Sequence, residues 1–379
     1  MAEEKHIMII AGEASGDLNA ANLCLALKQI SPHIKISGVG GELMRKAGAQ
    51  TYFDIKDLSV IGLFDAIKKL PKFFALRKLV LERIKKENPD AIILVDFSGF
   101  NLRLAKIVNK TVPTIYYISP QVWASREGRI KTIKHYIHKL IVFFKFEQEF
   151  YAKFGIEADF IGHPLLDIVR PTMKKEEFLS KFNLQESKAT IALLPGSRKQ
   201  EIENILPLML GASILIQKEI KDIQFIIAKA PQVDLGLYNN IINRFNIEAK
   251  IIEGKTYDCL QAADFCLVAS GTATLEAALM QKPFVIIYKM SLLNYLLYLP
   301  LVKVPYIGMV NIIAKKKIVP EFIQFQAQPQ RIAQEVLKFL QNPQEIERLK
   351  NELAKTKLLL GENGASMRAA GIILKFLGN

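Results

Sequence analysis

The feature that most constrains the fold is a regular alternation between short apolar runs and helical patterns. In the first half of the chain, the runs that read as strands are residues 6–11, 34–38, 91–95, 114–118 and 139–143. In the second half they are residues 191–194, 224–228, 250–253, 265–269 and 283–288. Alternating strands and helices predict parallel sheets that helices cover on both faces. The sequence therefore predicts an α/β protein.

The length of 379 residues is too great for one compact core and predicts two domains. Phe160-Ile161-Gly162-His163-Pro164, followed by Arg170-Pro171, is typical of a linker, because glycine and prolines coincide with a change of pattern. We expect Rossmann-like domains at residues 1–165 and 166–358. Such a pair binds its ligand at the carboxyl ends of the strands, in a central cleft between the domains.

The composition restricts the partners. A net charge of +14 favours nucleic acid, a phosphorylated substrate or an anionic membrane face. The charge is spread along the chain and no nucleic-acid module is recognisable, which argues against nucleic acid. The acidic start predicts no signal peptide, and the longest apolar run, residues 292–302, is shorter than the roughly 20 residues that span a bilayer. We expect a soluble or peripheral protein in a reducing compartment, with three scattered cysteines that form no metal motif.

Residues 193–202, Leu-Leu-Pro-Gly-Ser-Arg-Lys-Gln-Glu-Ile, join a strand to a helix through a sharp turn. Free backbone N–H groups at such a helix start form an anion site. Gly196 and Ser197 make the turn, and Arg198 adds a cation that can hold a phosphate through two hydrogen bonds. The alternative is an ordinary turn with a surface arginine.

The turn at Ser270-Gly271-Thr272 repeats this arrangement between a strand and a helix. Glu276 lies one helical turn further on, where it could accept hydrogen bonds from ribose hydroxyls while a phosphate binds at the turn. Two phosphate-type turns in one domain favour a nucleotide site over two unrelated turns.

In the first half, acidic residues follow two of the expected strands. Glu13, Ser15 and Asp17 belong to Gly-Glu-Ala-Ser-Gly-Asp after the first strand, and Asp96 ends a later one. Asp96 could act as a general base. Each group could instead cap a helix. The glycine pattern is not that of a dinucleotide site.

Bulky apolar groups alternate with lysines and arginines between residues 58 and 86. This pattern is typical of a segment that docks on a membrane surface, although a core helix with snorkelling lysines would look similar. The candidate contact residues are Ile61, Leu63, Phe64, Ile67, Lys68, Lys69, Phe73 and Phe74.

Seven stretches in the same order and spacing resemble the lipid-A-disaccharide synthase family, which consists of inverting glycosyltransferases with the GT-B fold. They are residues 12–17, 118–124, 128–131, 160–164, 193–202, 270–279 and 310–314. The resemblance implies transfer of 2,3-diacylglucosamine from UDP-2,3-diacylglucosamine to 2,3-diacylglucosamine 1-phosphate (lipid X). The products would be the β-1,6-linked disaccharide 1-phosphate of lipid A biosynthesis and UDP.

The resemblance also implies roles for individual residues. Arg198, Glu276 and Asn311 match the donor site, and Glu13 matches the acid of the first glycine loop. Ser15, Asp17 and Asn101 are expected on the acceptor side of the cleft. No metal or other cofactor is expected.

The resemblance further implies peripheral attachment to the cytoplasmic face of the inner membrane, through residues 61–74. The chain would be a monomer, or a dimer whose subunits exchange C-terminal elements. Residues 359–379 would form a helix that packs on the N-terminal domain or is exchanged in the dimer.

The chain departs from the family pattern at two positions. Gly99 replaces an aspartate that is a proposed catalytic base, so Asp96 or Glu13 takes that role, or proton removal matters less. Ser125 replaces a tryptophan. A different UDP-sugar enzyme, such as an epimerase, is the main alternative, although it would not need a membrane-docking segment.

Overall fold

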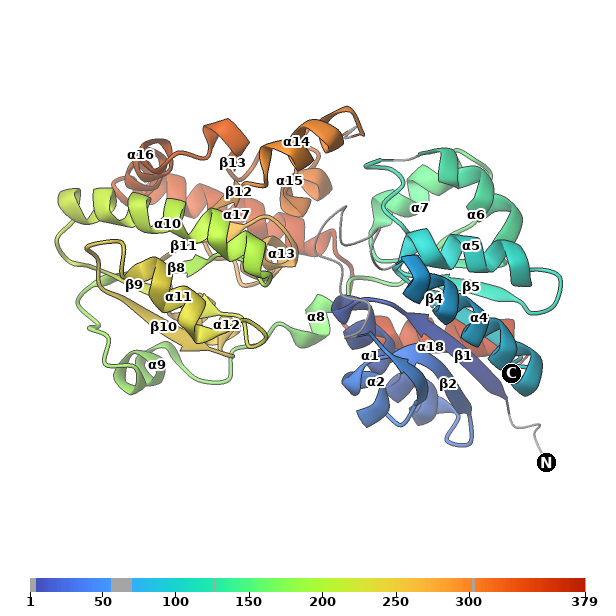
Figure 1. Cartoon of the computed structure of the whole chain (residues 1–379). Helices are drawn as coiled ribbons and strands as arrows, with labels where there is room; N and C mark the ends of the chain where they lie inside the picture. Colours follow the sequence, from blue (N-terminus) through green and yellow to red (C-terminus); the bar gives the residue numbers. More distant parts are fainter. Residues whose placement is uncertain (1–4, 56–69, 126, 302–303, 379) are drawn as a thin grey trace. The chain divides into compact units, whose positions relative to one another are not determined.

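The computed structural model describes residues 5–55, 70–125, 127–301 and 304–378. The chain divides into two compact units. Unit 1 comprises Met1–Pro164 and Leu360–Asn379, and unit 2 comprises Leu165–Leu359 (Figure 1). The chain therefore enters unit 2 once, completes it, and returns to unit 1 for its last helix.

Unit 1 is built on a parallel sheet in the order β3-β2-β1-β4-β5-β6-β7. Its strands are β1 (His6–Ala11), β2 (Lys35–Gly40), β3 (Gln50–Asp54), β4 (Ala91–Val95), β5 (Thr114–Tyr117), β6 (Lys139–Val142) and β7 (Asp159–Phe160). Every residue of the central strands β1, β4 and β5 is buried, as expected for a sheet that is covered on both faces.

The helices of unit 1 cover this sheet. They are α1 (Ala14–Ile30), α2 (Glu42–Lys46), α4 (Leu70–Glu87), α5 (Ser98–Val108), the short 3-10 helix η2 (Glu127–Arg129), α6 (Ile130–Tyr136), α7 (Lys145–Ala152) and α18 (Ala365–Phe376). α18 packs against α1 (Figure 1). Arg368 joins the returning chain to unit 1, because its Nε donates to the Ile161 carbonyl over 2.8 Å. The last helix is thus an integral part of unit 1.

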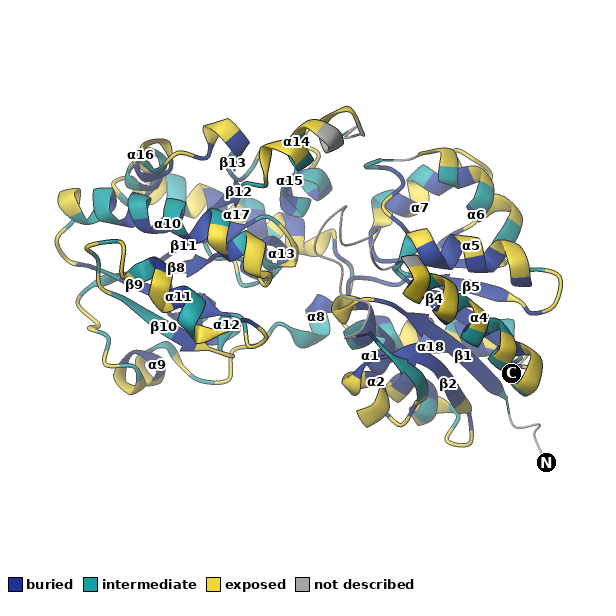
Figure 2. Cartoon of the chain, viewed as in Figure 1, coloured by how far each residue is buried: buried dark blue, intermediate teal, exposed yellow. Residues whose placement is uncertain are grey.

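Unit 2 has a second parallel sheet in the order β10-β9-β8-β11-β12-β13. Its strands are β8 (Ala189–Leu194), β9 (Ile223–Lys229), β10 (Ala249–Glu253), β11 (Phe265–Ala269), β12 (Phe284–Tyr288) and β13 (Glu321–Ile323). The buried side chains of β8, β9, β11 and β12 form one hydrophobic core with the surrounding helices (Figure 2).

The helices of unit 2 begin with α8 (Leu165–Ile168) and α9 (Lys175–Lys181). The others are α10 (Lys199–Glu219), α11 (Leu235–Ile242), α12 (Thr256–Ala262), α13 (Thr272–Leu279), α14 (Leu292–Tyr298), α15 (Met309–Ala314), α16 (Pro329–Leu340), α17 (Pro343–Leu358) and the 3-10 helices η3 (Leu299–Leu301) and η4 (Gln324–Gln326). No helix in the described part of the chain is long and apolar enough to cross a membrane.

The prediction of an α/β fold with parallel sheets is confirmed, but three edge strands were not predicted. β3, β7 and β13 lie at sheet edges, and the last two contain only two and three residues. Most of their residues are half-buried and their polarity is mixed, so they lack the apolar run that marks the central strands.

Both sheets have a point at which the strand order reverses. In unit 1 this point lies between β1 and β4, and in unit 2 between β8 and β11. Open α/β sheets bind ligands outside the carboxyl ends of the strands at such switch points. The loops that follow these four strands are therefore the first places to look for a site.

Candidate functional site

The loops after β1 and β4 touch at the switch point of unit 1. A Cβ on Gly12 would lie 2.3 Å from the Phe97 ring, so this close approach requires glycine. Asp96 and Phe97 both adopt left-handed backbone conformations, with φ of +48° and +44°. Such conformations are costly outside glycine and cluster at functional sites. The Tyr116 hydroxyl supports the turn by donating to the Asp96 carbonyl over 2.6 Å.

Asp96 is electrostatically perturbed. Burial is the main cause that raises the pKa of its carboxyl group to about 6, and the charge of nearby Glu13 adds to the effect. Glu13 itself is exposed. The structure therefore brings the two candidate bases together, with Asp96 the more buried. A carboxylate whose pKa is near 6 is mostly ionised at pH 7, and it is a stronger base than an ordinary aspartate.

Asp17 does not face the site. Its buried carboxylate accepts hydrogen bonds from the backbone N–H groups of Gly41, Leu43 and Met44 over 2.7, 3.1 and 3.2 Å. These groups are the unpaired donors at the start of α2, so Asp17 caps that helix from α1. These bonds give Asp17 a structural role, and its contact with the acceptor stays a prediction. Ser15, in contrast, is exposed in the loop after β1.

Asn101 is bonded within the protein through its amide nitrogen, whereas its buried Oδ1 has no hydrogen-bond partner among the described residues. Its buried side-chain amide donates to the carbonyl groups of Ile10, Val95 and Asp96 over 3.3, 3.2 and 2.9 Å. These carbonyls belong to the ends of β1 and β4 and to the strained turn. Asn101 therefore ties the two loops of the switch point together through its amide nitrogen, and its contact with the acceptor stays a prediction.

A buried polar cluster, which sequence reasoning missed, holds the loop after β5. Glu147 of α7 accepts from the Trp123 indole N–H over 3.0 Å and from the Ser119 hydroxyl over 3.3 Å. Ser119 also shares a hydrogen bond of 2.8 Å with the Tyr151 hydroxyl. Ile118, where the loop begins, has a φ of +68°, which is rare for a β-branched residue. The loop is thus held in a strained conformation beside β4.

Burial raises the pKa of Glu147 to about 7. A sequence signal for this residue exists, because Glu147 occupies the third position of α7 and accepts from the backbone N–H of Phe144 over 3.2 Å. An acid at that position is typical of a capping box. Its additional bonds to the loop after β5 depend on tertiary structure and could not be predicted.

In unit 2, the turn after β8 is already occupied by an acid of the protein. Glu201 accepts from the backbone N–H groups of Ser197 and Arg198 over 2.9 and 3.2 Å, and from the Arg198 guanidinium over 3.2 Å. The expectation of free N–H groups is therefore wrong in this state, because a capping box satisfies them. Gly196, with φ of +111°, leaves room for the Glu201 carboxylate, which a Cβ would approach to 2.5 Å.

The second turn of unit 2 follows β11 at the same switch point. Gly271 and Thr272 are exposed at the start of α13, and Gly271 has a φ of +147°. Glu276, one turn further on, accepts from the Tyr257 hydroxyl over 3.1 Å, and burial raises its pKa. The predicted donor residues, except Asn311, thus belong to the turns after β8 and β11 and to the helix α13 that follows the second turn.

Asn311 belongs to α15, which contacts α13, and it lies in a buried network. Its amide donates to Val319 and Glu321 over 2.8 Å each, and its oxygen accepts from the N–H groups of Ile318 and Val319 over 2.9 Å each. Its hydrogen-bonding capacity is therefore filled within the protein, which favours an indirect role, and its direct contact with the donor stays a prediction. Glu321 in turn binds the N–H groups of residues 307 and 308.

This network reaches the donor turn. The Ser270 hydroxyl donates to the Ile307 carbonyl over 3.4 Å, next to the N–H groups that Glu321 holds. Asn311 thus supports the segment against which Ser270 rests.

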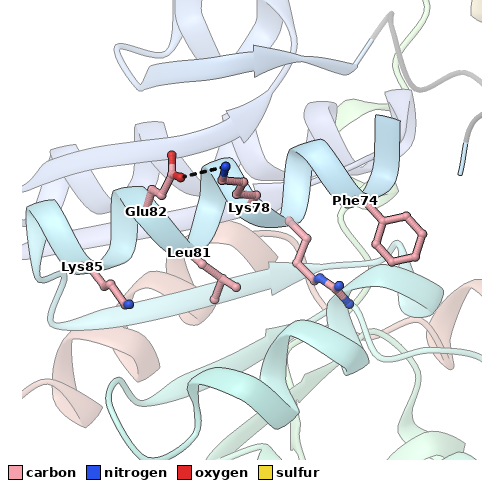
Figure 3. Close-up of a pocket in the computed structure, with 6 residues that line it drawn as sticks. Phe74, Lys78, Leu81, Glu82 and Lys85 are labelled. Atoms are coloured by element: carbon pink, nitrogen blue, oxygen red, sulfur yellow. Dashed lines mark ion pairs between the residues drawn. The ribbon is translucent and has the colours of Figure 1, made fainter. Parts of the chain in front are cut away.

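Most of the expected membrane segment, namely Ile61, Leu63, Phe64, Ile67, Lys68 and Lys69, lies outside the described residues. Phe73 is half-buried and packs on Phe97, with ring centroids 5.9 Å apart, so it lines the switch point. Phe74 is exposed, with the Arg77 guanidinium over its ring. Figure 3 shows Phe74 at one end of a shallow groove along α4 that also presents Lys78 and Lys85.

Comparisons with known proteins agree with this architecture. The model of a family described as lipid-A-disaccharide synthetase matches residues 7–376. A relative named lipid-A-disaccharide synthase, from Syntrophus aciditrophicus (strain SB), is 41% identical and aligns over 98% of each chain.

Two solved structures share the fold at low sequence identity. The S. aureus MnaA-UDP co-structure has a TM-score of 0.66 at 14% identity and covers 99% of this chain and 97% of its own. A glycosyltransferase from Rickettsia africae ESF-5 has a TM-score of 0.60 at 14% identity and covers 99% of each chain. These neighbours confirm the expected GT-B fold. With the match along almost the whole sequence, they lead to one conclusion: the chain belongs to the lipid-A-disaccharide synthetase family of glycosyltransferases.

Proposed function

We propose that the chain transfers 2,3-diacylglucosamine from UDP-2,3-diacylglucosamine to lipid X with inversion, releasing UDP. The observation that supports this proposal is that the switch point of unit 1 carries a base and the switch point of unit 2 carries groups that can bind a diphosphate. Unit 1 presents a basic carboxylate, and unit 2 presents two glycine turns with an arginine. A glycosyl transfer between two phosphorylated sugars requires a base for the acceptor hydroxyl and groups that stabilise the leaving diphosphate.

On the acceptor side, we assign the general base to Asp96. The acceptor hydroxyl attacks the anomeric carbon, and its proton passes to the Asp96 carboxylate as the new C–O bond forms. Gly99 carries no group that could accept this proton, whereas Asp96 is held at the strained turn and has a raised pKa. Glu13 assists by raising the basicity of Asp96.

On the donor side, the bond between the anomeric carbon and the UDP oxygen breaks, and the diphosphate gains negative charge. Arg198 and the turn at Ser270–Thr272 are the groups we assign to stabilise that charge. Glu201 competes for the same backbone N–H groups, so donor binding displaces its carboxylate or uses the free edge of the Arg198 guanidinium. Glu276 is assigned to the ribose hydroxyls.

The acylated substrates require access to a membrane surface. We propose that the chain docks on the cytoplasmic face of the inner membrane through residues 61–74. Exposed Phe74 supports this docking, as does the groove of α4, in which Arg77, Lys78 and Lys85 outnumber the one acid, Glu82. Phe64→Ser with Phe74→Ser is expected to weaken co-sedimentation with anionic vesicles, and unchanged co-sedimentation would remove the role from this segment. A dimer with exchanged C-terminal helices would preserve the packing of α18 on α1.

The decisive experiment mixes the protein with UDP-2,3-diacylglucosamine and radiolabelled lipid X in detergent micelles with excess EDTA. We expect labelled disaccharide 1-phosphate. Arg198→Ala is expected to lower turnover by about 10²-fold or more, the scale for loss of one preorganised charge stabiliser. Lys199→Ala, a change to the exposed neighbouring cation, is the matched control and should leave turnover near that of the wild type.

Other outcomes separate the alternatives. Product with magnesium but none with EDTA would keep the reaction and overturn its metal independence. No product under either condition, from a folded protein that binds UDP, would favour another UDP-sugar reaction. An assay for epimerisation of UDP-GlcNAc would then identify the main alternative.

A further inference from the structure

We propose that unit 2 carries its own membrane-docking face, formed by α14, η3 and Phe325, which inserts shallowly into an anionic phospholipid bilayer. This docking face is defined as Leu292, Leu293, Leu296, Leu299 and Phe325. It belongs to the donor unit and is separate in sequence from the segment at residues 61–74. It goes beyond the proposed transferase reaction, because it does not depend on which sugar is transferred.

The docking face exposes an unusual amount of apolar surface. Its four leucines are each between 52% and 57% exposed, and Phe325 is 65% exposed. Positions 292, 293, 296 and 299 follow helical spacing, so these side chains lie on one side of the α14–η3 segment. Figure 2 colours much of α14 as exposed. Isolated exposed leucines need no explanation, but a contiguous stripe of them indicates an interaction surface.

Hydrogen bonds and a contact between two aromatic rings hold the parts of the docking face together. The side-chain amide of buried Gln324 donates to the Met290 carbonyl over 3.0 Å and accepts from the Met290 N–H over 3.2 Å. This pairing ties the residues just before α14 to the residue just before Phe325. The rings of Tyr295 and Phe325 then pack edge to face, with centroids 6.0 Å apart. α14 and Phe325 are therefore presented together as one surface.

The surrounding charge identifies the partner. From Ala277 to Pro320 the sequence contains six lysines and no aspartate or glutamate. Lys315, Lys316 and Lys317 are exposed directly after α15. Lys316 also forms an ion pair with Glu352 of α17. An apolar stripe within a basic stretch of sequence matches an anionic bilayer, in which leucines enter the acyl boundary and lysines meet the phosphates. Tyr295 is a residue type that is common at such interfaces.

The same charge argues against a second copy of the chain as the occupant. A two-fold symmetric contact through the docking face would bring the two basic regions together, and like charges oppose that contact. The apolar run at residues 292–302 is also shorter than the roughly 20 residues that cross a bilayer, so α14 would lie in the plane of the interface.

The test measures co-sedimentation of the full chain with vesicles of phosphatidylglycerol and phosphatidylcholine, and with vesicles of phosphatidylcholine alone, without substrate. The variant carries Leu292→Ser, Leu293→Ser, Leu296→Ser and Leu299→Ser. We expect its partition onto the anionic vesicles to fall by about tenfold or more, because apolar burial drives interfacial binding. A matched control carries Leu235→Ser and Leu358→Ser, two exposed leucines elsewhere in unit 2, and should bind as the wild type does.

A second measurement keeps the proposal testable if the quadruple variant fails to fold. The three native cysteines are buried, so Leu296→Cys offers one accessible thiol for an environment-sensitive fluorophore. We expect a blue shift of its emission on addition of anionic vesicles, which high salt reduces. Lys315→Glu with Lys317→Glu should weaken the same response.

Two results would overturn the proposal. One is an unchanged partition of the folded quadruple variant together with no spectral shift at position 296. The other is loss of self-association in light scattering while vesicle binding stays intact, which would assign the docking face to contact between copies. Neither result depends on turnover in detergent micelles, so failure of the docking face and failure of the transferase proposal are distinguishable.

Discussion

At the scale of single residues, the charge state of Asp96 decides whether the acceptor hydroxyl can lose its proton. The pKa of Asp96 is raised to about 6, and a general base works only when it is deprotonated. We therefore expect kcat/KM to rise with pH and to level off above about 6. Asp96→Asn should lower turnover by roughly 10²- to 10⁴-fold, the usual contribution of general base catalysis.

A substitution of Glu13 tests the same prediction independently. Its negative charge helps to raise the pKa of Asp96, so Glu13→Gln should move the midpoint of the pH profile to lower pH. A profile that stays unchanged in Asp96→Asn would exclude Asp96 as the base.

Glu147 makes a prediction about stability. Its pKa is raised to about 7 in the folded protein, so between about pH 4.5 and 7 the folded state retains a proton that the unfolded chain has lost. The free energy of unfolding therefore falls as the pH rises through this window, by up to about 3 kcal/mol. Glu147→Gln removes this dependence. Measurements of Tm at pH 5 and pH 8 should show a smaller decrease in the variant than in the wild type.

Glu157→Gln is the matched control, because Glu157 is an exposed acid in the same unit. An equal pH dependence of Tm in the wild type and in Glu147→Gln would show that Glu147 titrates normally.

At the scale of elements, the turn after β8 combines a helix start with an internal anion. Glu201 neutralises Arg198 and binds two backbone N–H groups that could otherwise face a diphosphate. We expect Glu201→Gln to bind UDP about two- to fivefold more tightly, because exposed charge interactions contribute up to about 1 kcal/mol. Isothermal titration with UDP measures this change. Weaker binding in the variant would mean that Glu201 assists the donor instead of competing with it.

The capping of α2 by Asp17 leads to a different kind of prediction. Asp17→Ala leaves three buried or half-buried N–H groups without their acceptor and should destabilise unit 1 by about 1–3 kcal/mol. Turnover per folded molecule should stay near that of the wild type. Thermal unfolding and turnover measured on the same sample check both parts. A large loss of turnover with unchanged stability would instead support a direct contact between Asp17 and the acceptor.

At the scale of the whole molecule, the sequence predicted the sheets better than the site. The central strands are continuous apolar runs, and the glycine turns follow them directly, so both could be recognised from local pattern. The positions of Asp96, Arg198 and the Ser270 turn at the switch points followed from this pattern.

Other roles depend on contacts between distant segments. Asp17 reaches α2, Asn311 fills its bonds with residues 318–321, and Glu147 holds a loop more than 20 residues away. A single sequence carries no signal for such pairings, because an acid or amide in a loop looks the same whether it binds substrate or backbone. The competition of Glu201 for the donor turn was missed for the same reason, although its capping-box spacing is visible.

The last helix gives a prediction at this scale. α18 packs on α1, and Arg368 donates to the carbonyl groups of Ile161, Glu362 and Asn363. Deletion of residues 360–379 should therefore destabilise unit 1 and leave the fold of unit 2 intact. Hydrogen exchange resolved by peptide is expected to accelerate in α1 and not in α10. Equal acceleration in both helices would mean that the two units unfold together.

The interrupted path of unit 1 also has a consequence for biosynthesis. α1 ends at Ile30 and its partner α18 begins at Ala365, so 334 residues, including all of unit 2, are synthesised between these two helices. At about 5–20 residues per second, the nascent chain waits roughly 17 to 67 s with the apolar face of α1 uncovered. Unit 2 can fold during that interval, whereas unit 1 cannot be completed. Newly made chains should therefore depend on chaperones through their N-terminal half until the final helix emerges.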